Sequence, residues 1–344
     1  MPHPLRLESE ILELRTRHPF IIARGGQSDY RTVLVRLIDG DGVEGWGEAA
    51  PNRIYGESVE TVHGALQNYS DRLPSDPFLL EDAESGWESI LALNPSARVA
   101  LSSALHDLVG KRLGIPVYKL WGLDPAKAPR STFTIGIDND AKLRQKVKEA
   151  EQYPILKIKL GTDRDAEILE TIRGMTQKEL RVDANCGWSV KQAIRMLPVL
   201  EEFGVTVLEQ PLAAADLEGL GKVSRASRIP VIADESCKTA ADIPPLVGKV
   251  DGINLKLAKC GSLREALRMS VRNSSEVERR DRSHPPFRVG PGSGYRERRQ
   301  PPASWCDHHG DTGRQLQALV ERGSHWRRGS GWWRTERPGP ADRC

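Results

Sequence analysis

Hydrophobic and polar positions alternate along the first part of the chain with the period of β-strands. The alternation runs through segments 5–14, 30–39 and 42–49, and a Gly-Asp-Gly sequence at 40–42 separates the last two. A period of two is typical of strands that bury one face. The pattern predicts an antiparallel sheet that contains a hairpin.

From 57 to 113 the apolar spacing changes to that of helices. Segments 61–73 and 97–113 repeat apolar residues every three or four positions, and Gly114 and Pro116 follow the second segment. Glycine and proline at these places are typical helix stops. The first third of the chain therefore predicts a small α+β domain.

After residue 131 short apolar strands alternate with amphipathic helices, and a new strand begins about every 25 residues. This alternation favours a parallel sheet, and six successive units without a glycine-rich nucleotide loop favour a (β/α) barrel. In such barrels the carboxyl ends of the strands build the active site. The predicted strands are 132–137, 155–160, 180–185, 205–210, 230–235 and 252–257.

Polar residues stand at the ends of five successive predicted strands. One charged residue in such a place is usually a solvated loop residue, but five strands in succession are poorly explained in this way. The residues are Lys157 and Lys159, Asp183 and Asn185, Glu209, Asp234 and Glu235, and Asn254 and Lys256.

Three of these residues are carboxylates on neighbouring strands. Asp183, Glu209 and Asp234 should converge on one point above the barrel mouth, because parallel strands end at the same side. A hard divalent cation would remove their mutual repulsion, and an all-oxygen ligand set suits Mg²⁺ better than zinc. The alternative is that the three carboxylates pair with lysine or arginine.

Lysines occupy the second and sixth predicted barrel strands. Lys157 and Lys159 are two residues apart and point to the same side, while Lys256 lies four strands further round. Four strands are half of an eight-stranded barrel, so Lys159 and Lys256 should face each other across the mouth. The alternative for the Lys-Ile-Lys segment is a half-exposed edge strand.

This arrangement suits proton transfer on either face of one carbon. A hydrogen next to a carboxylate is weakly acidic, and its removal makes an enediolate whose second negative charge Mg²⁺ can stabilise. A lysine acts as a base only if its pKa falls toward about 7–8. Lys157 and the cation would lower the pKa of Lys159.

Six short segments follow one another in a specific order: TFTIG, KIK, DANCGW, LEQP, ADES and NLKLAKCG. Together they resemble the muconate-lactonizing-enzyme subgroup of the enolase superfamily, over residues 1–269. The resemblance implies an α+β capping domain that covers a modified (β/α) barrel. It also implies that Asp183, Glu209 and Asp234 bind Mg²⁺.

The same resemblance implies roles for residues outside the carboxylate set. Lys159 and Lys256 match the acid/base pair, with Lys157 supporting Lys159, and Thr134 in the first barrel strand matches a substrate-contacting position. The segments HPFIIARG, YGES and DANCGW are most similar to dipeptide epimerases. In those enzymes an early loop closes over the substrate, which makes Arg24 a candidate to bind a substrate carboxylate; the alternative is an exposed arginine in a glycine-rich turn.

The implied function is Mg²⁺-dependent epimerisation of a dipeptide, such as one of the L-Ala-D/L-Glu type, by 1,1-proton transfer through an enediolate. Dipeptide epimerases carry an acidic motif on the eighth barrel strand, and no such motif follows Met269. Muconate cycloisomerase, o-succinylbenzoate synthase and N-acylamino-acid racemase functions therefore stay open. A further alternative is a non-catalytic protein whose basic tail binds nucleic acid.

The predicted organisation has three parts. Residues 1–125 form the capping domain, residues 126–269 form strands one to six of the barrel, and residues 270–344 form an atypical tail that is irregular. The barrel is expected to be incomplete after its sixth strand.

The tail differs in composition from the body. Residues 1–269 contain 15 Lys and 18 Ile, and residues 270–344 contain neither. The tail carries 15 Arg against 9 acidic residues, while the body carries 35 Lys and Arg against 38. A shifted reading frame in a GC-rich gene would replace Lys and Ile codons with those for Arg, Gly and Pro. The alternative is a natural disordered Arg-rich tail.

The remaining composition predicts a cytoplasmic protein, and the family resemblance implies a small-molecule substrate. Hydrophobic residues make up 38% and charged residues 28% of the chain, which is ordinary for a globular protein. The five cysteines show no CxxC pair and no zinc spacing, and no apolar run could span a bilayer. We expect neither nucleic-acid nor membrane partners, and a homo-oligomer is compatible with the sequence.

Overall fold

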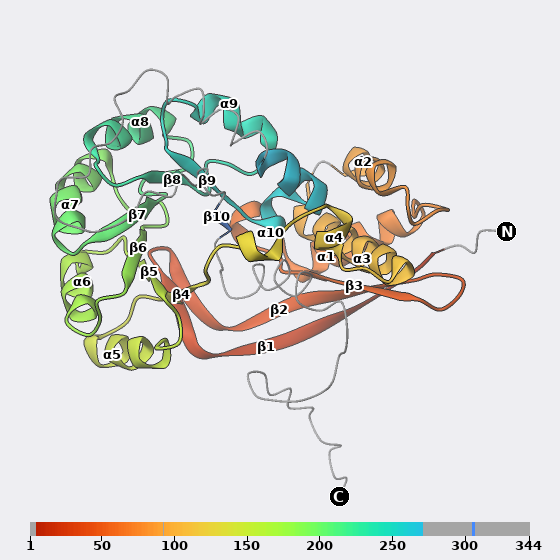
Figure 1. Cartoon of the computed structure of the whole chain (residues 1–344), viewed down its shortest axis with the longest axis horizontal. Coiled ribbons are helices and arrows are strands. Elements are labelled where there is room, and N and C mark those ends of the chain that lie inside the picture. The colour runs from red at the N-terminus through yellow and green to blue at the C-terminus, as the bar shows by residue number, and fades with distance from the viewer. Residues whose placement is uncertain (1–4, 92, 271–304, 307–344) are drawn as a thin grey trace, which may run out of the picture.

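A computed structural model of the chain describes residues 5–91, 93–270 and 305–306. Figure 1 shows an antiparallel sheet with its helices beside a curved parallel sheet whose helices lie on the outer side of the curve. The strands are β1 Arg6–Ile22, β2 Gly25–Ile38, β3 Glu44–Ala49, β4 Thr132–Ile135, β5 Ile155–Lys159, β6 Glu179–Asp183, β7 Val205–Glu209, β8 Val231–Ala233, β9 Gly252–Leu255 and β10 Trp305–Cys306. The α-helices are α1 Val59–Ser70, α2 Leu80–Ile90, α3 Pro95–Leu113, α4 Val117–Leu120, α5 Asp140–Glu149, α6 Asp165–Arg173, α7 Val190–Glu202, α8 Leu217–Ala226, α9 Ile243–Leu246 and α10 Leu257–Cys260.

The antiparallel sheet has the order β1-β2-β3, as the alternating pattern predicts. Helix α3 packs closely on β3, and the small residues of both elements allow this approach. A Cβ added to Gly47 would lie 2.0 Å from the carbonyl oxygen of Ala100, so any larger residue would push the helix away. The helix ends at Gly114, whose φ of 67° is the left-handed conformation that glycine adopts readily.

The strands β4 to β9 lie in the parallel sheet in the order of the sequence. Each strand is hydrogen-bonded to the next, and a helical segment connects the two. The six strands curl into a half-barrel, which confirms the predicted fold class (Figure 1). Within the described residues the sheet does not close, because β4 stands at one edge and β10 at the other. All carboxyl ends of the parallel strands therefore lie along one arc.

Strand β10 is a short addition that the expectation of an irregular tail did not include. Trp305 and Cys306 pair in parallel with Asn254 and Leu255 at the β9 edge. This is one two-residue strand and not the two regular strands that would complete the barrel. The rest of the tail lies outside the described residues, so the shifted-frame hypothesis stays a prediction.

Two hydrophobic clusters support the two sheets. One contains Val33, Val35, Leu66, Trp87 and Leu101, and the other contains buried apolar residues of the parallel sheet and of the helices that cover it. The division at residues 125 and 126 stays a prediction.

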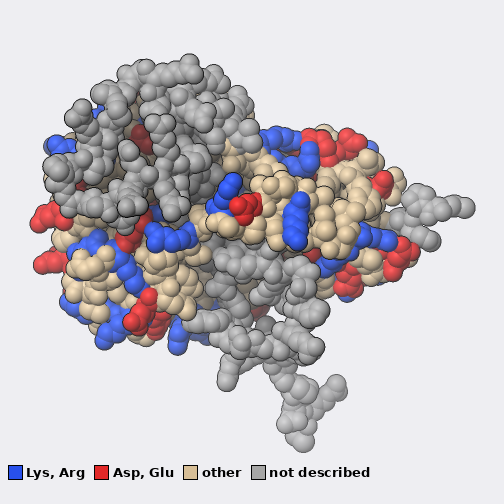
Figure 2. All heavy atoms as spheres, in the orientation of Figure 1, with Lys and Arg blue, Asp and Glu red and all other residues tan. Residues whose placement is uncertain are grey.

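None of the helices in the described parts of the chain has the length and apolar character needed to cross a bilayer. In Figure 2 acidic and basic residues are interspersed over the visible described surface.

Candidate metal and proton-transfer site

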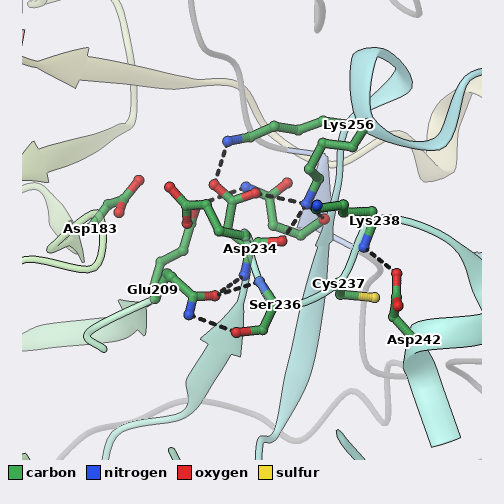
Figure 3. Close-up of polar contacts among 12 residues, drawn as sticks. Asp183, Glu209, Asp234, Ser236, Cys237, Lys238, Asp242 and Lys256 are labelled. Carbon is green, nitrogen blue, oxygen red and sulfur yellow. Dashed lines mark hydrogen bonds and ion pairs between the residues drawn. The ribbon is translucent and has the colours of Figure 1, made fainter. Parts of the chain in front are cut away.

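Three carboxylates meet at the carboxyl ends of neighbouring strands. Asp183 ends β6, Glu209 ends β7, and Asp234 follows β8 directly. One oxygen from each lies within 4.8 Å of the others, and all three residues are buried. Figure 3 shows Asp183 and Glu209 on neighbouring strands and Asp234 close to both. The predicted convergence is confirmed.

The carboxylates are surrounded by ammonium groups. Two negative charges 4.8 Å apart repel by about 3.5 kcal/mol at an effective dielectric constant of about 20, so a buried triad needs positive charge. Lys157 Nζ bridges Asp183 Oδ2 at 3.1 Å and Glu209 Oε2 at 2.7 Å. Asn254 Nδ2 donates to the other oxygen of Glu209 at 2.8 Å. The alternative, in which the carboxylates pair with lysines, thus matches the contacts that Lys157 makes with Asp183 and Glu209.

Lys159 lies at the end of β5 and contacts the triad from that side. Its Nζ donates to Asp183 Oδ2 at 2.5 Å, and its side chain is fully buried. Burial is the main cause that lowers the pKa of Lys159; Lys157 also lowers it, while Asp183 acts in the opposite direction. The expected effect of Lys157 on Lys159 therefore has the predicted direction.

Lys256 reaches the triad from the other end of the arc. It follows β9, and its Nζ donates to Asp234 Oδ2 (Figure 3). Burial acts to lower the pKa of Lys256, but Asp234 and Glu209 outweigh this effect and the pKa is raised above its ordinary value. The two lysines thus contact opposite members of the triad, Asp183 and Asp234.

Arg24 lies in the turn between β1 and β2, which reaches the carboxyl ends of the parallel strands. Its Nη1 donates to the carbonyl oxygen of Asn185 and its Nη2 to Glu235 Oε1, both at 2.5 Å. Its side chain is 32% exposed, and the choice between a substrate-binding arginine and an exposed arginine in a glycine-rich turn stays open. The antiparallel sheet is thereby tied to the loops after β6 and β8.

The turn that carries Arg24 packs closely against glycines in the loops of the barrel. Gly161 has φ of +106°, and an added Cβ would lie 2.7 Å from both the Ala23 Cβ and the Ala184 carbonyl oxygen. The ring of Phe20, near the end of β1, lies 5.8 Å from Lys159 Nζ. The first hairpin therefore covers the β5 side of the site. Thr134 lies in β4, in register with Lys157.

The comparisons with known proteins cover most of the chain. Residues 7–122 match the N-terminal domain of the mandelate racemase / muconate lactonizing enzyme family, and residues 140–271 match the enolase C-terminal domain-like family. A relative from Bacteroides thetaiotaomicron, L-Ala-D/L-Glu epimerase, is 44% identical over 259 residues, which are 75% of this chain and 67% of the relative. The chain belongs to the mandelate racemase / muconate lactonizing enzyme family of the enolase superfamily.

Other members of this family are similar in sequence and structure. An L-Ala-D/L-amino acid epimerase from Maribacter sp. is 38% identical over 265 residues, with 77% of each chain covered. The crystal structure of the dipeptide epimerase from Enterococcus faecalis, complexed with Mg and the dipeptide L-Leu-L-Tyr, aligns with a TM-score of 0.76. It is 30% identical, and 79% of each chain is covered.

The donor set of this family member fits Mg²⁺. Three buried carboxylate oxygens lie within 4.8 Å of one another, and oxygens around Mg²⁺ at about 2.1 Å are separated by at most about 4.2 Å. The observed separations exceed that limit by at most about 0.6 Å. The fit rests on geometry and on the absence of sulfur or imidazole from the cluster.

Two residues of the site were missed by the sequence reasoning. Gln210 accepts from the backbone N–H groups of Asp234 and Ser236, and it donates to Ser236 Oγ, so it joins the ends of β7 and β8. Lys259, three residues after Lys256, is buried against Asp234. The only sequence signal for Lys259 is a charged residue inside an otherwise apolar LAKC segment.

Proposed function

We propose that this chain catalyses Mg²⁺-dependent epimerisation of a dipeptide by 1,1-proton transfer at the carbon next to a carboxylate. The observation that carries this proposal is the approach of two lysines to one carboxylate triad from opposite ends of the strand arc. A single base would suffice for deprotonation, whereas inversion needs a proton donor on the opposite face. The epimerase names of the similar relatives support the choice of reaction.

In this proposal Asp183, Glu209 and Asp234 hold the cation. Bound there, Mg²⁺ would stabilise the negative charge that develops on the substrate carboxylate. Lys159 and Lys256 exchange the proton: the neutral amine of one takes it from the α-carbon, and the ammonium of the other delivers one to the opposite face. The electron pair of the broken C–H bond is held meanwhile in the enediolate.

Three further residues complete the proposed site. Lys157, which contacts both Asp183 and Glu209, supports Lys159 by placing a second positive charge beside it. Thr134 contacts the substrate from β4. Arg24 exchanges its partner Glu235 for a carboxylate of the substrate, because a guanidinium binds carboxylates well and already lies over the strand ends.

The test of the function is deuterium exchange. The full chain is incubated with a dipeptide library in D₂O, with and without Mg²⁺, and the products are analysed by mass spectrometry. Mg²⁺-dependent gain of one mass unit identifies both the reaction and the substrate. Muconate and N-acylamino acids are assayed in parallel, and turnover of these substrates alone would contradict dipeptide epimerisation.

Replacing Arg24 with methionine should lower kcat/KM about 10- to 100-fold for a substrate with a side-chain carboxylate. For a substrate with an apolar side chain the effect should be small, since no charge-assisted bond is lost. Steady-state kinetics on an acidic and an apolar dipeptide measures the difference. Arg164→Met, which removes surface pairs with Asp140 and Glu167 at the start of α6, is the control. An equal loss of kcat/KM on both substrates would show that Arg24 only holds the loops after β6 and β8 in place and does not bind the substrate.

We also propose that residues 270–344 result from a shifted reading frame. The absence of Lys and Ile from this segment supports the proposal, as does a family match that ends at residue 271. Resequencing the gene should reveal another frame that encodes two further strand–helix units and an acidic motif. An enzyme translated in that frame should be at least about tenfold more active. A gene with no such frame would contradict the proposal.

We propose a cytoplasmic location and a division into a capping domain of residues 1–125 and a barrel domain of residues 126–269. The free thiols of Cys186, Cys237 and Cys260 support a reducing compartment. The two separate hydrophobic clusters support the division. Absence of nucleic-acid and membrane partners, and a homo-oligomeric state, stay predictions.

A further inference from the structure

Lys259 has an ammonium group whose three protons are all donated inside the protein. Its Nζ lies 2.7 Å from Asp234 Oδ1, 2.7 Å from the Asp234 carbonyl oxygen and 2.7 Å from the Asn254 carbonyl oxygen. A lysine has three N–H donors and no acceptor, so this group has no proton left for a substrate. Lys259 is therefore a structural cation and not a second base beside Lys256.

The two lysines hold different oxygens of the same carboxylate. Lys256 donates to Asp234 Oδ2, and Lys259 donates to Asp234 Oδ1. Lys259 is also bonded to the backbone at the ends of β8 and β9, whereas the hydrogen bond of Lys256 is to a side chain. Both bonds are charge-assisted, but three bonds fix Lys259 in place, so Oδ1 stays occupied when Lys256 moves from Oδ2 toward a substrate.

This difference decides how Asp234 can bind a cation. A carboxylate oxygen that accepts from an ammonium fixed by two backbone carbonyls is poorly available as a metal ligand, so Oδ2 is the Asp234 oxygen that can bind the cation once Lys256 moves away. Mg²⁺ requires near-octahedral geometry and is served by single carboxylate oxygens, whereas Ca²⁺ takes six to eight oxygens and often binds both oxygens of one carboxylate. A triad that cannot use both oxygens of Asp234 disfavours the larger ion.

We propose that Lys259 is a positioning residue that withholds Asp234 Oδ1 from the cation and thereby gives the site its preference for Mg²⁺ over Ca²⁺. The inference rests on the proposed metal site. It assigns to Lys259 a role that differs from that of Lys157, Lys159 and Lys256. A purely structural role would change folding stability and leave the ratio of the two metal affinities unchanged.

Lys146 offers a matched control elsewhere in the chain. It is also buried, and its Nζ contacts Asp138 Oδ2 at 3.0 Å and the Gly136 carbonyl oxygen at 3.4 Å. Lys146→Met removes a buried ammonium from a carboxylate without touching the triad. Lys259→Met makes the same chemical change beside Asp234.

The test is titration calorimetry of the full-length wild-type chain and both variants with MgCl₂ and with CaCl₂. Lys259→Met should weaken Mg²⁺ binding by about 10-fold and reduce the Mg²⁺/Ca²⁺ affinity ratio by at least about 10-fold. Lys146→Met should leave that ratio within about twofold of wild type. An unchanged ratio in Lys259→Met overturns the inference, whereas wild-type chain that binds neither ion contradicts the proposed function itself.

A second measurement covers the case in which Lys259→Met does not fold. The wild-type chain is crystallised with Mg²⁺. One Asp234 oxygen should lie at about 2.1 Å from the ion while the other stays within hydrogen-bond distance of Lys259 Nζ. Two Asp234 oxygens bound to the ion, or Lys259 turned away from Asp234, would overturn the inference independently of any variant.

Discussion

Lys256→Ala should lower the rate of epimerisation in both directions by about 10²- to 10⁴-fold, the usual contribution of a positioned acid or base. In the proposed mechanism inversion needs both lysines, because each acts on one side of the carbon. The loss should appear in kcat and not mainly in KM, since proton transfer and not binding is removed. The assay follows each substrate epimer separately by circular dichroism or chiral chromatography.

The two-base arrangement makes a more specific claim for this variant. With Lys256 removed, Lys159 can still exchange the α-proton of the epimer that presents it to the β5 side. Deuterium should therefore enter one epimer at a measurable rate while the other stays unlabelled. Retention of full epimerase activity would show that Lys256 is not an acid or base. Lys249→Ala, which removes a surface pair with Glu218, is the control for loss of a lysine near β9.

Glu209→Gln should abolish measurable epimerisation, with a loss of at least about 10³-fold, and should weaken Mg²⁺ binding by at least about 100-fold. Glu209 lies on the middle strand of the three that carry the triad, and its two oxygens contact Lys157 and Asn254. Glutamine keeps the size of the side chain but removes the negative charge. A neutral amide neither balances the nearby ammonium nor binds a hard cation as strongly as a carboxylate.

The measurement combines Mg²⁺ titration calorimetry with the exchange assay, and thermal unfolding checks the fold. Glu167→Gln on α6, whose carboxylate pairs with Arg164 at the surface, is the matched control and should behave as wild type. Wild-type affinity for Mg²⁺ in Glu209→Gln would exclude Glu209 from the metal site. Loss of activity with normal Mg²⁺ binding would instead show that Glu209 acts only by positioning Lys157 through their ion pair.

Much of the barrel and its site was predictable from local patterns. The alternation of short apolar strands with amphipathic helices predicts parallel strands in sequence order, and this order puts every strand end on one arc. Asp183, Glu209 and Asp234 could therefore be grouped without coordinates, because each follows the same kind of strand. Lys159 and Lys256 were placed at the two ends of the arc by the same rule.

Contacts between distant segments were not predictable in this way. Arg24 pairs with Glu235, which is 211 residues further along the chain, and no periodicity relates the two positions. The close packing of the Arg24 turn against Gly161 is possible because glycine has no side chain at this position. The two segments meet only when the two sheets are packed together.

The sequence by itself determined the order of the strands, the identity of the carboxylate triad and the placement of two lysines on either side of it, because hydrophobic periodicity and strand-end position are local properties. Only the tertiary structure decided that Lys259 rather than solvent holds Asp234 Oδ1, and that Arg24 already has a carboxylate partner. The physical reason is that burial and hydrogen bonding of a charged side chain depend on which strand ends and loops surround it. Those neighbours are brought together by packing and not by their spacing along the chain.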